Sequence, residues 1–236
     1  MKYFKAWLGI VLFTFLFLYT VFNISLWPGL KEVLYPRISL PQMLGQHLIL
    51  VLISSFAAVL AGVPLGIFVT RKSGSGFKGI AGDLGALSQT IPPVAVLALA
   101  VPLVGFGFKP TVLALFLYSI LPILRNTIAG LEEVSPAVKE AARGMGMTRS
   151  EILFKVELPL ALPVLFAGIR MSVVVNVGTA TIGAVVGAGG LGNPIISGIV
   201  WNNQAFILEG AVTTAILAVL LDQIIGRIEQ SVLPGK

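Results

Sequence analysis

Six apolar runs, each about as long as a lipid bilayer is thick, restrict what this chain can fold into. They cover residues 6–26, 46–69, 86–105, 111–131, 163–187 and 205–225. Inside the hydrocarbon layer every backbone amide must be bonded within the protein, which favours helices over other structures. The mean hydropathy of +0.97 lies far outside the range of soluble domains. We therefore predict an all-α membrane protein with about six transmembrane helices.

The first apolar run follows Lys2 and Lys5, as the apolar part of a signal peptide would. It is too long for that role, and the bulky Leu26 and Trp27 stand where a cleavage site needs small side chains. We therefore expect residues 6–26 to remain in the protein as a helix. The expected division of the chain is an N-terminal helix with its connection at 1–45, a transmembrane core at 46–225 and a tail at 226–236.

Lysine and arginine residues are distributed unevenly between the connections of these helices. If the N-terminus lies in the cytoplasm, three basic residues fall on the outer side: Lys31, Arg37 and Lys109. Twelve fall on the inner side: Lys2, Lys5, Arg71, Lys72, Lys78, Arg125, Lys139, Arg143, Arg149, Lys155, Arg227 and Lys236. Because positively charged short loops stay in the cytoplasm, we predict that both termini are cytoplasmic.

The reactive side chains of this chain exclude most enzymes and metal sites. There is no cysteine and a single histidine, His47, which we expect near a membrane interface. No catalytic triad or paired carboxylate site can be assembled. Gly187, Gly189 and Gly192 match the dinucleotide pattern GxGxxG, but the alternating strand and helix context is missing. We therefore expect no catalytic residue, bound cofactor or metal, and the dispersed basic residues argue against nucleic acid.

A short charged stretch, EAARGMGMTRSEILFKVELP at residues 140–159, contrasts with the apolar chain around it. Start and stop patterns predict a first short helix here. Ser135 can cap its N-terminus and Pro136 suits its first turn. Gly144 or Gly146 can supply the left-handed residue that ends it.

A second short helix is predicted directly after this glycine turn. Thr148 followed by Glu151 matches a capping box, and we expect the helix to end at Pro159. We call residues 135–159 the two-helix segment.

The first helix of the two-helix segment carries a narrow apolar stripe made largely of small side chains, at spacings i, i+3, i+4 and i+7: Val138, Ala141, Ala142 and Met145. Charged residues flank it: Lys139, Glu140 and Arg143. Small side chains let another surface approach closely, and flanking charges fix its orientation. We therefore interpret it as a docking helix, the alternative being an amphipathic helix that rests on lipid headgroups.

The spacing of Glu140, Ala141, Ala142 and Gly146, followed after nine residues by the run Val156–Pro159, resembles the EAA loop of binding-protein-dependent ABC importer permeases. Only Val156, where isoleucine is common, departs from the usual form. The resemblance implies a type I ABC importer permease fold with a cytoplasmic coupling helix. It gives Ala141 and Ala142 close contact with a separate ATPase, makes Glu140 a polar anchor and Gly146 the bend, and includes Leu158 and Pro159 in the motif.

A glycine-rich segment, residues 176–204, is the second informative stretch. Gly183 and Gly187 form a small-xxx-small pair, and Thr179 and Thr181 can hydrogen-bond across a helix interface. Its later glycines are expected to break the helix, with a short helix at NPIISGIVW. The segment is a candidate pathway wall or outer gate, with these residues: Thr179, Thr181, Gly187, Gly189 and Gly192.

Pro92 and Pro93 disrupt the start of the third apolar run. They mark either the entry point of a helix or a flexing gate beside the pathway.

The runs GTATIGAVVGAGGLGNPIISGI and LSQTIPPVAVLALAVPLVGFG resemble the quaternary-amine branch of these permeases. That resemblance implies a permease subunit of the bacterial inner membrane that imports a compatible solute such as glycine betaine, choline, carnitine or proline. A permease for methionine or an oxyanion is the alternative, since methionine importers share the GAGGLG run.

The resemblance also implies partners. This chain has no Walker A sequence, so ATP and Mg²⁺ are expected on separate ATPase subunits. A solute-binding protein, a second permease subunit, alike or different, and membrane lipid complete the expected assembly. An ion-coupled secondary transporter is less well supported, because the carboxylates near the apolar runs, Asp83, Glu209 and Asp222, are few and peripheral.

Overall fold

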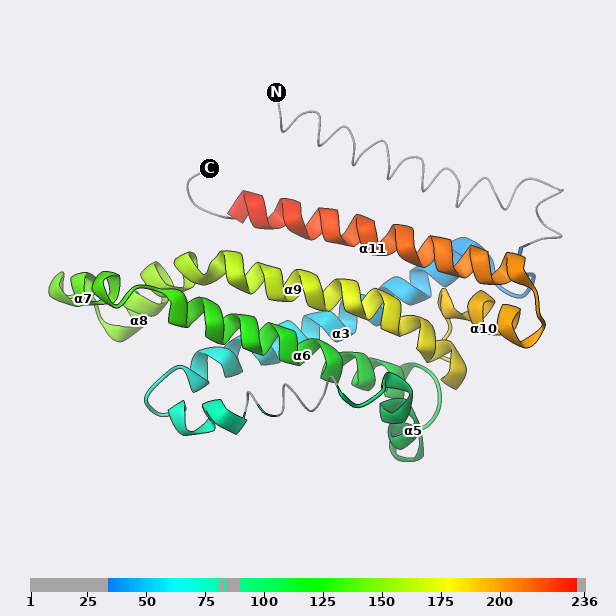
Figure 1. Ribbon diagram of the computed structural model, residues 1–236, viewed down its shortest axis with the longest axis horizontal. Coiled ribbons are helices and arrows are strands. Elements are labelled where there is room, and N and C mark those ends of the chain that lie inside the picture. The colour runs from blue at the N-terminus through cyan, green and yellow to red at the C-terminus, as the bar shows by residue number, and fades with distance from the viewer. Residues whose placement is uncertain (1–33, 81–82, 84–89, 233–236) are drawn as a thin grey trace, which may run out of the picture. The chain divides into compact units, whose positions relative to one another are not determined.

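The computed structural model describes residues 34–80, 83 and 90–232, and within them it contains helices and no strand. The long helices are α3 (Leu40–Val69), α6 (Phe108–Glu133), α9 (Leu158–Ala180) and α11 (Gln204–Val232) (Figure 1). The shorter ones are α5 (Pro93–Val104), α7 (Pro136–Gly144), α8 (Arg149–Ile152) and α10 (Gly192–Val200). Two 3₁₀ turns, η1 (Ser75–Phe77) and η3 (Thr181–Val186), and one π turn, η2 (Leu153–Glu157), complete the described elements.

Among the described residues, four helical runs are long and apolar enough to cross a membrane: Leu40–Val69, Phe108–Glu133, Arg149–Val186 and Gln204–Val232. They confirm four of the six expected transmembrane helices. α5 is apolar but has only 12 residues, and residues 84–89, which precede it in the expected third span, lie outside the described residues. The expected first helix at residues 6–26 also lies outside them.

The chain forms two compact units. The first combines residues of Met1–Ile53 with Pro93–Leu115 and Val174–Gln223, and the second combines Ser54–Pro92, Phe116–Val173 and Ile224–Lys236. The four long helices contribute residues to both units. The first unit contains α5, η3 and α10, whereas the second contains the whole two-helix segment.

Small residues let the long helices approach closely in the second unit. A methyl group at Gly66 of α3 would lie 2.6 Å from Cβ of Thr127 in α6. A methyl group at Gly130 of α6 would lie 3.0 Å from the carbonyl oxygen of Ala161 in α9. Helices in membranes associate by this kind of close packing, because lipid chains are as apolar as the side chains. The glycines therefore position α3 and α9 on α6.

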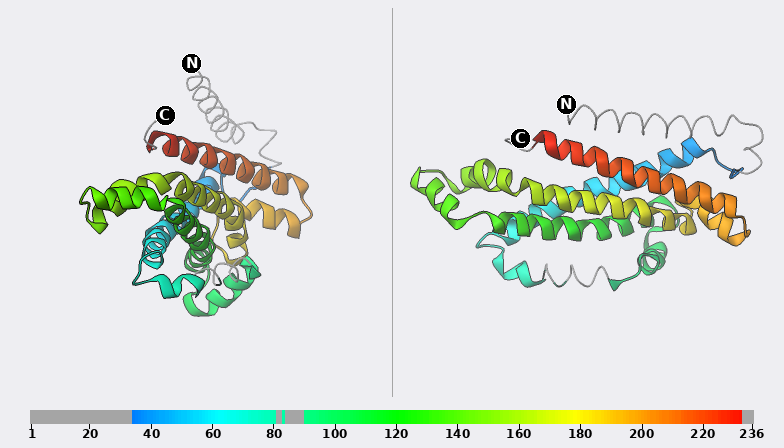
Figure 2. Two further views of the ribbon diagram at one scale, coloured as in Figure 1. Left: turned by 60° about the vertical axis from the view of Figure 1, so that its left-hand side comes forward. Right: turned by 45° about the horizontal axis from the view of Figure 1, so that its top comes forward.

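In the first unit, α5, α6 and η3 pack around one apolar core. Leu97 of α5, Ala114 of α6 and Val186 of η3 are buried in it. The N–H of Gly107, in the turn before α6, donates to the Val186 carbonyl over 2.7 Å. α10 lies beside the beginning of α11 (Figure 2), where a methyl group at Gly210 would come within 2.7 Å of the Leu191 carbonyl oxygen.

Candidate functional site

α7 begins where the sequence predicts, but its first turn is not capped as expected. Ser135 occupies the N-cap position and Pro136 follows at the first helical position. The Ser135 hydroxyl makes no capping hydrogen bond, and the Ser135 carbonyl instead accepts from the N–H groups of Val138 and Lys139. Proline at this position has no N–H that needs a partner, so the first turn requires less from a cap.

The turn that ends α7 is built around Gly146. Its φ of +79° lies in the left-handed region that favours glycine. The Gly146 N–H donates to the Arg143 carbonyl over 2.9 Å, and the Met147 N–H donates to the Ala142 carbonyl over 3.2 Å. This pair of bonds is a Schellman motif, which satisfies two carbonyl groups at the helix end. Of the two glycines that the sequence offered, Gly146 and not Gly144 supplies the left-handed residue.

Gly146→Ala is expected to destabilise this turn by about 1 kcal/mol, because an L-residue with a Cβ is strained in the left-handed region. No atom lies within 4 Å of the added methyl group, so backbone strain is the whole effect. Gly146→Asn should cost less, since asparagine tolerates this conformation. Gly144→Ala, at a helical position that is equally open, is the matched control. Thermal unfolding of the detergent-solubilised variants measures the difference, and equal losses at both glycines would contradict it.

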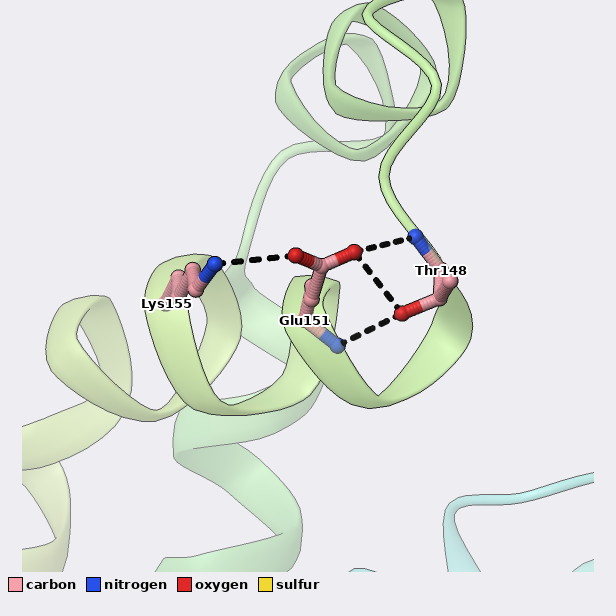
Figure 3. A network of polar contacts seen from close by, with 3 residues as sticks. All are labelled: Thr148, Glu151 and Lys155. Carbon is pink, nitrogen blue, oxygen red and sulfur yellow. Dashed lines mark hydrogen bonds and ion pairs between the residues drawn. The ribbon is translucent and has the colours of Figure 1, made fainter.

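α8 begins with the predicted capping box, shown in Figure 3. The Thr148 N–H donates to Oε2 of Glu151 over 3.0 Å, and the Glu151 N–H donates to Oγ1 of Thr148 over 3.3 Å. The ammonium of Lys155 donates to Oε1 of Glu151 over 2.9 Å. The two-helix segment therefore contains caps of its own at the turn between its helices.

The expected end of the second helix at Pro159 is wrong. The chain stays helical from α8 through the π turn η2 and into α9, which contains both Pro159 and Pro163. At the junction the Leu158 N–H bonds to the Leu153 carbonyl, five residues back. This wider turn changes the bonding pattern directly before Pro159, which has no N–H to donate. The two-helix segment is thus joined to a membrane helix without an intervening loop.

The predicted apolar stripe on α7 is divided between two environments. Ala142 is only 2% exposed and faces the interior of the chain. Val138, Ala141 and Met145 are exposed, Met145 to 74%, as is Glu140. Ala142 therefore seats α7, and the other three apolar residues form a free surface, which we call the α7 outer face.

Glu157 is a site residue whose role the sequence analysis missed. It is 5% exposed, and its carboxylate lies 2.6 Å from Nη2 of Arg71 and 3.5 Å from Nζ of Lys139. The Lys139 ammonium also donates to the Leu131 carbonyl over 3.0 Å. A carboxylate between Val156 and Leu158 is a signal for such pairing, because a buried charge requires a partner. The identity of the partners could not be inferred, since Arg71 is distant in the sequence.

The glycine-rich segment breaks α9 as expected, by a change from α-helix to the 3₁₀ turn η3 after Ala180. Gly187, Gly189 and Gly190 then all have positive φ angles, between +78° and +83°. The prediction that Thr179 and Thr181 bond across a helix interface is wrong. Their hydroxyls donate to nearby carbonyls of α9, Thr179 to Val175 and Thr181 to Gly178. Threonine hydroxyls commonly bond to a carbonyl three or four residues back, so local acceptors were available to both side chains.

Gly183 and Gly187 differ in what they do. A methyl group at Gly183 would lie 2.5 Å from Cγ2 of Thr111 in α6, so close packing requires glycine there. A methyl group at Gly187 would have no neighbour within 4 Å, and glycine is favoured there by its positive φ angle in the turn. α10 forms at the expected short helix.

Two side chains of α3 hold the glycine-rich segment. The amide oxygen of Gln46 accepts from the Gly190 N–H over 3.0 Å. His47 is completely buried within the first unit. Its Nδ1 accepts from the Leu191 N–H over 3.3 Å, and its Nε2 lies 2.9 Å from the Val177 carbonyl. His47 thus joins the backbone before η3 to the backbone after it.

His47→Leu is expected to lower the free energy of unfolding by about 2 kcal/mol, because it leaves a buried N–H and a buried carbonyl without their bonds. Thermal unfolding of the purified protein checks the loss. Thr70→Val, which removes a local hydroxyl bond to Ile67 in the second unit, is the control and should cost less. An unchanged unfolding temperature for His47→Leu would show that these bonds do not stabilise the segment.

Pro92 and Pro93 lie at a helix break. Thr90 is helical, the next two residues are not, and α5 begins at Pro93. The Tyr118 hydroxyl of α6 donates to the Ile91 carbonyl directly before the two prolines.

Nothing in the described part of the chain forms a metal site, since no group of three or more His, Asp or Glu side chains gathers there. The described chemistry is instead that of a helical membrane protein with an exposed two-helix segment.

Residues 62–233 match the family model described as "Binding-protein-dependent transport system inner membrane component". The chain belongs to this family of membrane transport proteins. The expected membership in the binding-protein-dependent importer permeases is thereby confirmed.

Several transport permeases from other bacteria are similar to this chain over most of their length. The osmoprotectant import permease protein OsmY of Salmonella typhimurium is 42% identical over 197 residues, which cover 84% of either chain. The carnitine transport permease protein OpuCD of Listeria monocytogenes is 44% identical over 185 residues, 77% of this chain and 80% of the relative. The glycine betaine/carnitine/choline transport system permease protein OpuCB of Bacillus subtilis is 41% identical over 192 residues, 80% and 87% of the two chains.

Solved structures show the same fold. An inward-facing MetNI methionine ABC transporter chain matches with a TM-score of 0.71 and 26% identity, over 80% of this chain and 93% of that one. A second crystal form matches with a TM-score of 0.68 and 27% identity, over the same shares. The expected importer permease fold is therefore confirmed for this family member.

Proposed function

We propose that this chain is the membrane-spanning subunit of an ATP-driven importer for a compatible solute of the glycine betaine, choline, carnitine or proline type. The proposal depends above all on the two-helix segment. The turn between its helices is stabilised by a Schellman motif and a capping box, its outer face is exposed, and it continues directly into α9. These are the properties required of an element that receives movement from another protein and passes it to a membrane helix.

On this proposal the α7 outer face contacts an ATPase subunit that carries ATP and Mg²⁺. Ala141 permits close approach, Val138 and Met145 supply apolar contact, and Glu140 orients the two surfaces by charge. Ala142 and Gly146 act indirectly, by seating α7 and by forming its turn. Leu158 and Pro159 connect the segment to α9.

The similarity of named relatives supports the solute class. The relatives named for osmoprotectants, carnitine, choline and glycine betaine are 41–44% identical to this chain. The methionine transporter chains are 26–27% identical. A methionine or oxyanion permease is therefore the second choice.

We propose that the glycine-rich segment forms a wall of the solute pathway, with Thr179, Thr181, Gly187, Gly189 and Gly192. The bonds from Gln46 and His47 favour a fixed wall over a moving gate. The break at Pro92 and Pro93 is the better candidate for a flexing gate, because non-helical backbone separates Thr90 from α5 there.

The proposed assembly consists of two permease subunits, alike or different, two ATPases, a solute-binding protein and surrounding lipid. The unequal distribution of basic residues supports a location in the bacterial inner membrane with both termini in the cytoplasm. The two-helix segment then lies on the same side as the ATPase.

Reconstitution tests the proposal. The permease is placed in liposomes with its neighbouring ATPase and binding protein, and uptake of labelled glycine betaine, choline, carnitine, proline and methionine is measured with and without ATP. ATP-dependent uptake of a compatible solute is expected. Uptake by the permease alone in a sodium or proton gradient would instead indicate a secondary transporter, and ATP-dependent uptake of methionine alone would change the solute class.

A further inference from the structure

A buried carboxylate stands at the junction between the two-helix segment and the membrane helix that follows. Glu157 is the last residue of the π turn η2, and α9 begins at the next residue. Its carboxylate is nearly excluded from solvent and faces two cations, Arg71 and Lys139. The contact with Arg71, at 2.6 Å, is an ion pair without the alignment of a hydrogen bond.

These contacts bring together four elements of the second unit. Arg71 lies just after the end of α3, and Lys139 belongs to α7. The Lys139 ammonium also bonds to the Leu131 carbonyl in the last turns of α6, and Glu157 itself precedes α9. We call Arg71, Lys139 and Glu157 the ionic junction. Through it α7 is fixed to the ends of three long helices.

The backbone between α8 and α9 is a weak point that additional contacts can stabilise. A π turn is an uncommon insertion in a helix and often marks a functional position. η2 lies between α8 and α9, and two prolines, Pro159 and Pro163, follow within the first turns of α9. The backbone bonds alone would allow this stretch to bend under load, because prolines remove helix bonds. The ion pairs of Glu157 with α7 and the end of α3 oppose that bending.

We propose that Glu157 is a positioning residue which holds α7 at a fixed angle to α3 and α9, so that movement imposed on α7 reaches the membrane helices. The inference rests on the proposed function for its transport consequence. Its structural part, the angle of α7, is independent of any partner. Removal of the Glu157 charge leaves two partly buried cations, Arg71 and Lys139, without their common counter-charge, which favours rearrangement of α7.

A distance measurement on the permease alone tests the structural part. The chain has no cysteine, so Lys72→Cys and Arg143→Cys, both exposed, give a unique pair of spin labels on the end of α3 and on α7. A narrow distance distribution is expected with native Glu157, and a broader or shifted one with Glu157→Gln. The control is Glu132→Gln, which removes a carboxylate from the exposed ion pair with Lys78 and should leave the distribution unchanged. Native-like distances in Glu157→Gln would overturn the proposal.

The transport consequence is measured as solute imported per ATP hydrolysed by the reconstituted complex. Glu157→Gln is expected to lower this ratio by at least about fivefold, the lower end of typical coupling between two sites. A residue that only stabilises the fold lowers the amount of active complex and leaves the ratio unchanged, so an unchanged ratio would overturn the proposal. Failure of the native complex to import solute would refute the proposed function, whereas the label distances would still test the ionic junction.

Lys139→Met keeps the test decisive if Glu157→Gln does not fold. It removes one partner and retains the pair between Arg71 and Glu157. Broader label distances and a lower ratio are expected again. Where Glu157→Gln does fold, the double variant is expected to lose no more coupling than either single variant, because both changes interrupt the same connection. Additive losses, or native behaviour of Lys139→Met in both measurements, would contradict a connection through this pair.

Discussion

Ala142→Glu is expected to abolish ATP-driven import and to detach α7 from the rest of the permease. The Ala142 side chain is almost completely buried, so the new carboxylate would have to lose its water or displace the helix. Burial of an unpaired charge costs several kcal/mol, more than a short helix gains from its caps. The Ala142 carbonyl also accepts the longer bond of the Schellman motif, so displacement would loosen the turn at Gly146.

Ala141→Glu is the matched control, because Ala141 is adjacent in sequence but exposed. Both variants should lose import. Only Ala142→Glu should make α7 of the isolated permease more sensitive to protease and to amide hydrogen exchange, since Ala141→Glu acts on the partner surface alone. Equal protection of α7 in the two isolated variants would show that Ala142 does not seat the helix.

Gly192→Ala is expected to prevent the first unit from folding normally. A methyl group at Gly192 would lie 1.9 Å from the carbonyl oxygen of Thr181 and 2.9 Å from Cβ of Ala184. The nearest obstacle is backbone of η3, so no side-chain rotation relieves the contact and the whole turn must move. Overpacking of this kind costs about 3 kcal/mol or more. The yield of monodisperse protein in detergent and its unfolding temperature measure the effect.

Gly187→Ala in the same segment separates steric overlap from backbone strain. Gly187 has a φ of +78° and open space around it, so the substitution should cost only about 1 kcal/mol. Gly192→Ala should therefore be clearly the less stable variant. The reverse order of stabilities would mean that the approach of Gly192 to Thr181 is not a tight contact in solution.

The features that sequence patterns predicted correctly are those determined by neighbours in the chain. Apolar length located α3, α6, α9 and α11, because a helix that crosses lipid needs a continuous run of apolar residues. The capping box of Thr148 and Glu151 and the glycine turn after α7 follow from residues within one helical turn. Such patterns need no knowledge of the tertiary structure.

The features that sequence patterns did not predict depended on contacts between distant residues or on a rare backbone form. His47 is buried because two backbone groups of the glycine-rich segment meet it, and their positions depend on the path of the chain. The helix continues through Pro159 because the π turn alters the bonding just before it, and a π turn is a rare form without a start or stop pattern in the sequence. The hydroxyls of Thr179 and Thr181 donate to nearby carbonyls of α9 and not across a helix interface.

The partners of Glu157 show the same limit at the candidate site. Start and stop patterns located the two-helix segment, but local patterns and motif spacing do not identify Arg71, which lies beyond α3, as a partner. A lone acidic residue in an apolar run predicts a buried ion pair, but it does not identify the cations in that pair.

The fold of the two-helix segment and its exposed surface depend on different residues. The Schellman turn and the capping box use backbone groups, Gly146 and two polar side chains, none of which belongs to the α7 outer face. Mutations at Val138, Ala141 or Met145 can therefore accumulate without refolding the permease. In a cell with several related importers, paralogous permeases could therefore diverge in the ATPase that they bind. The fold of the two-helix segment would be conserved between them.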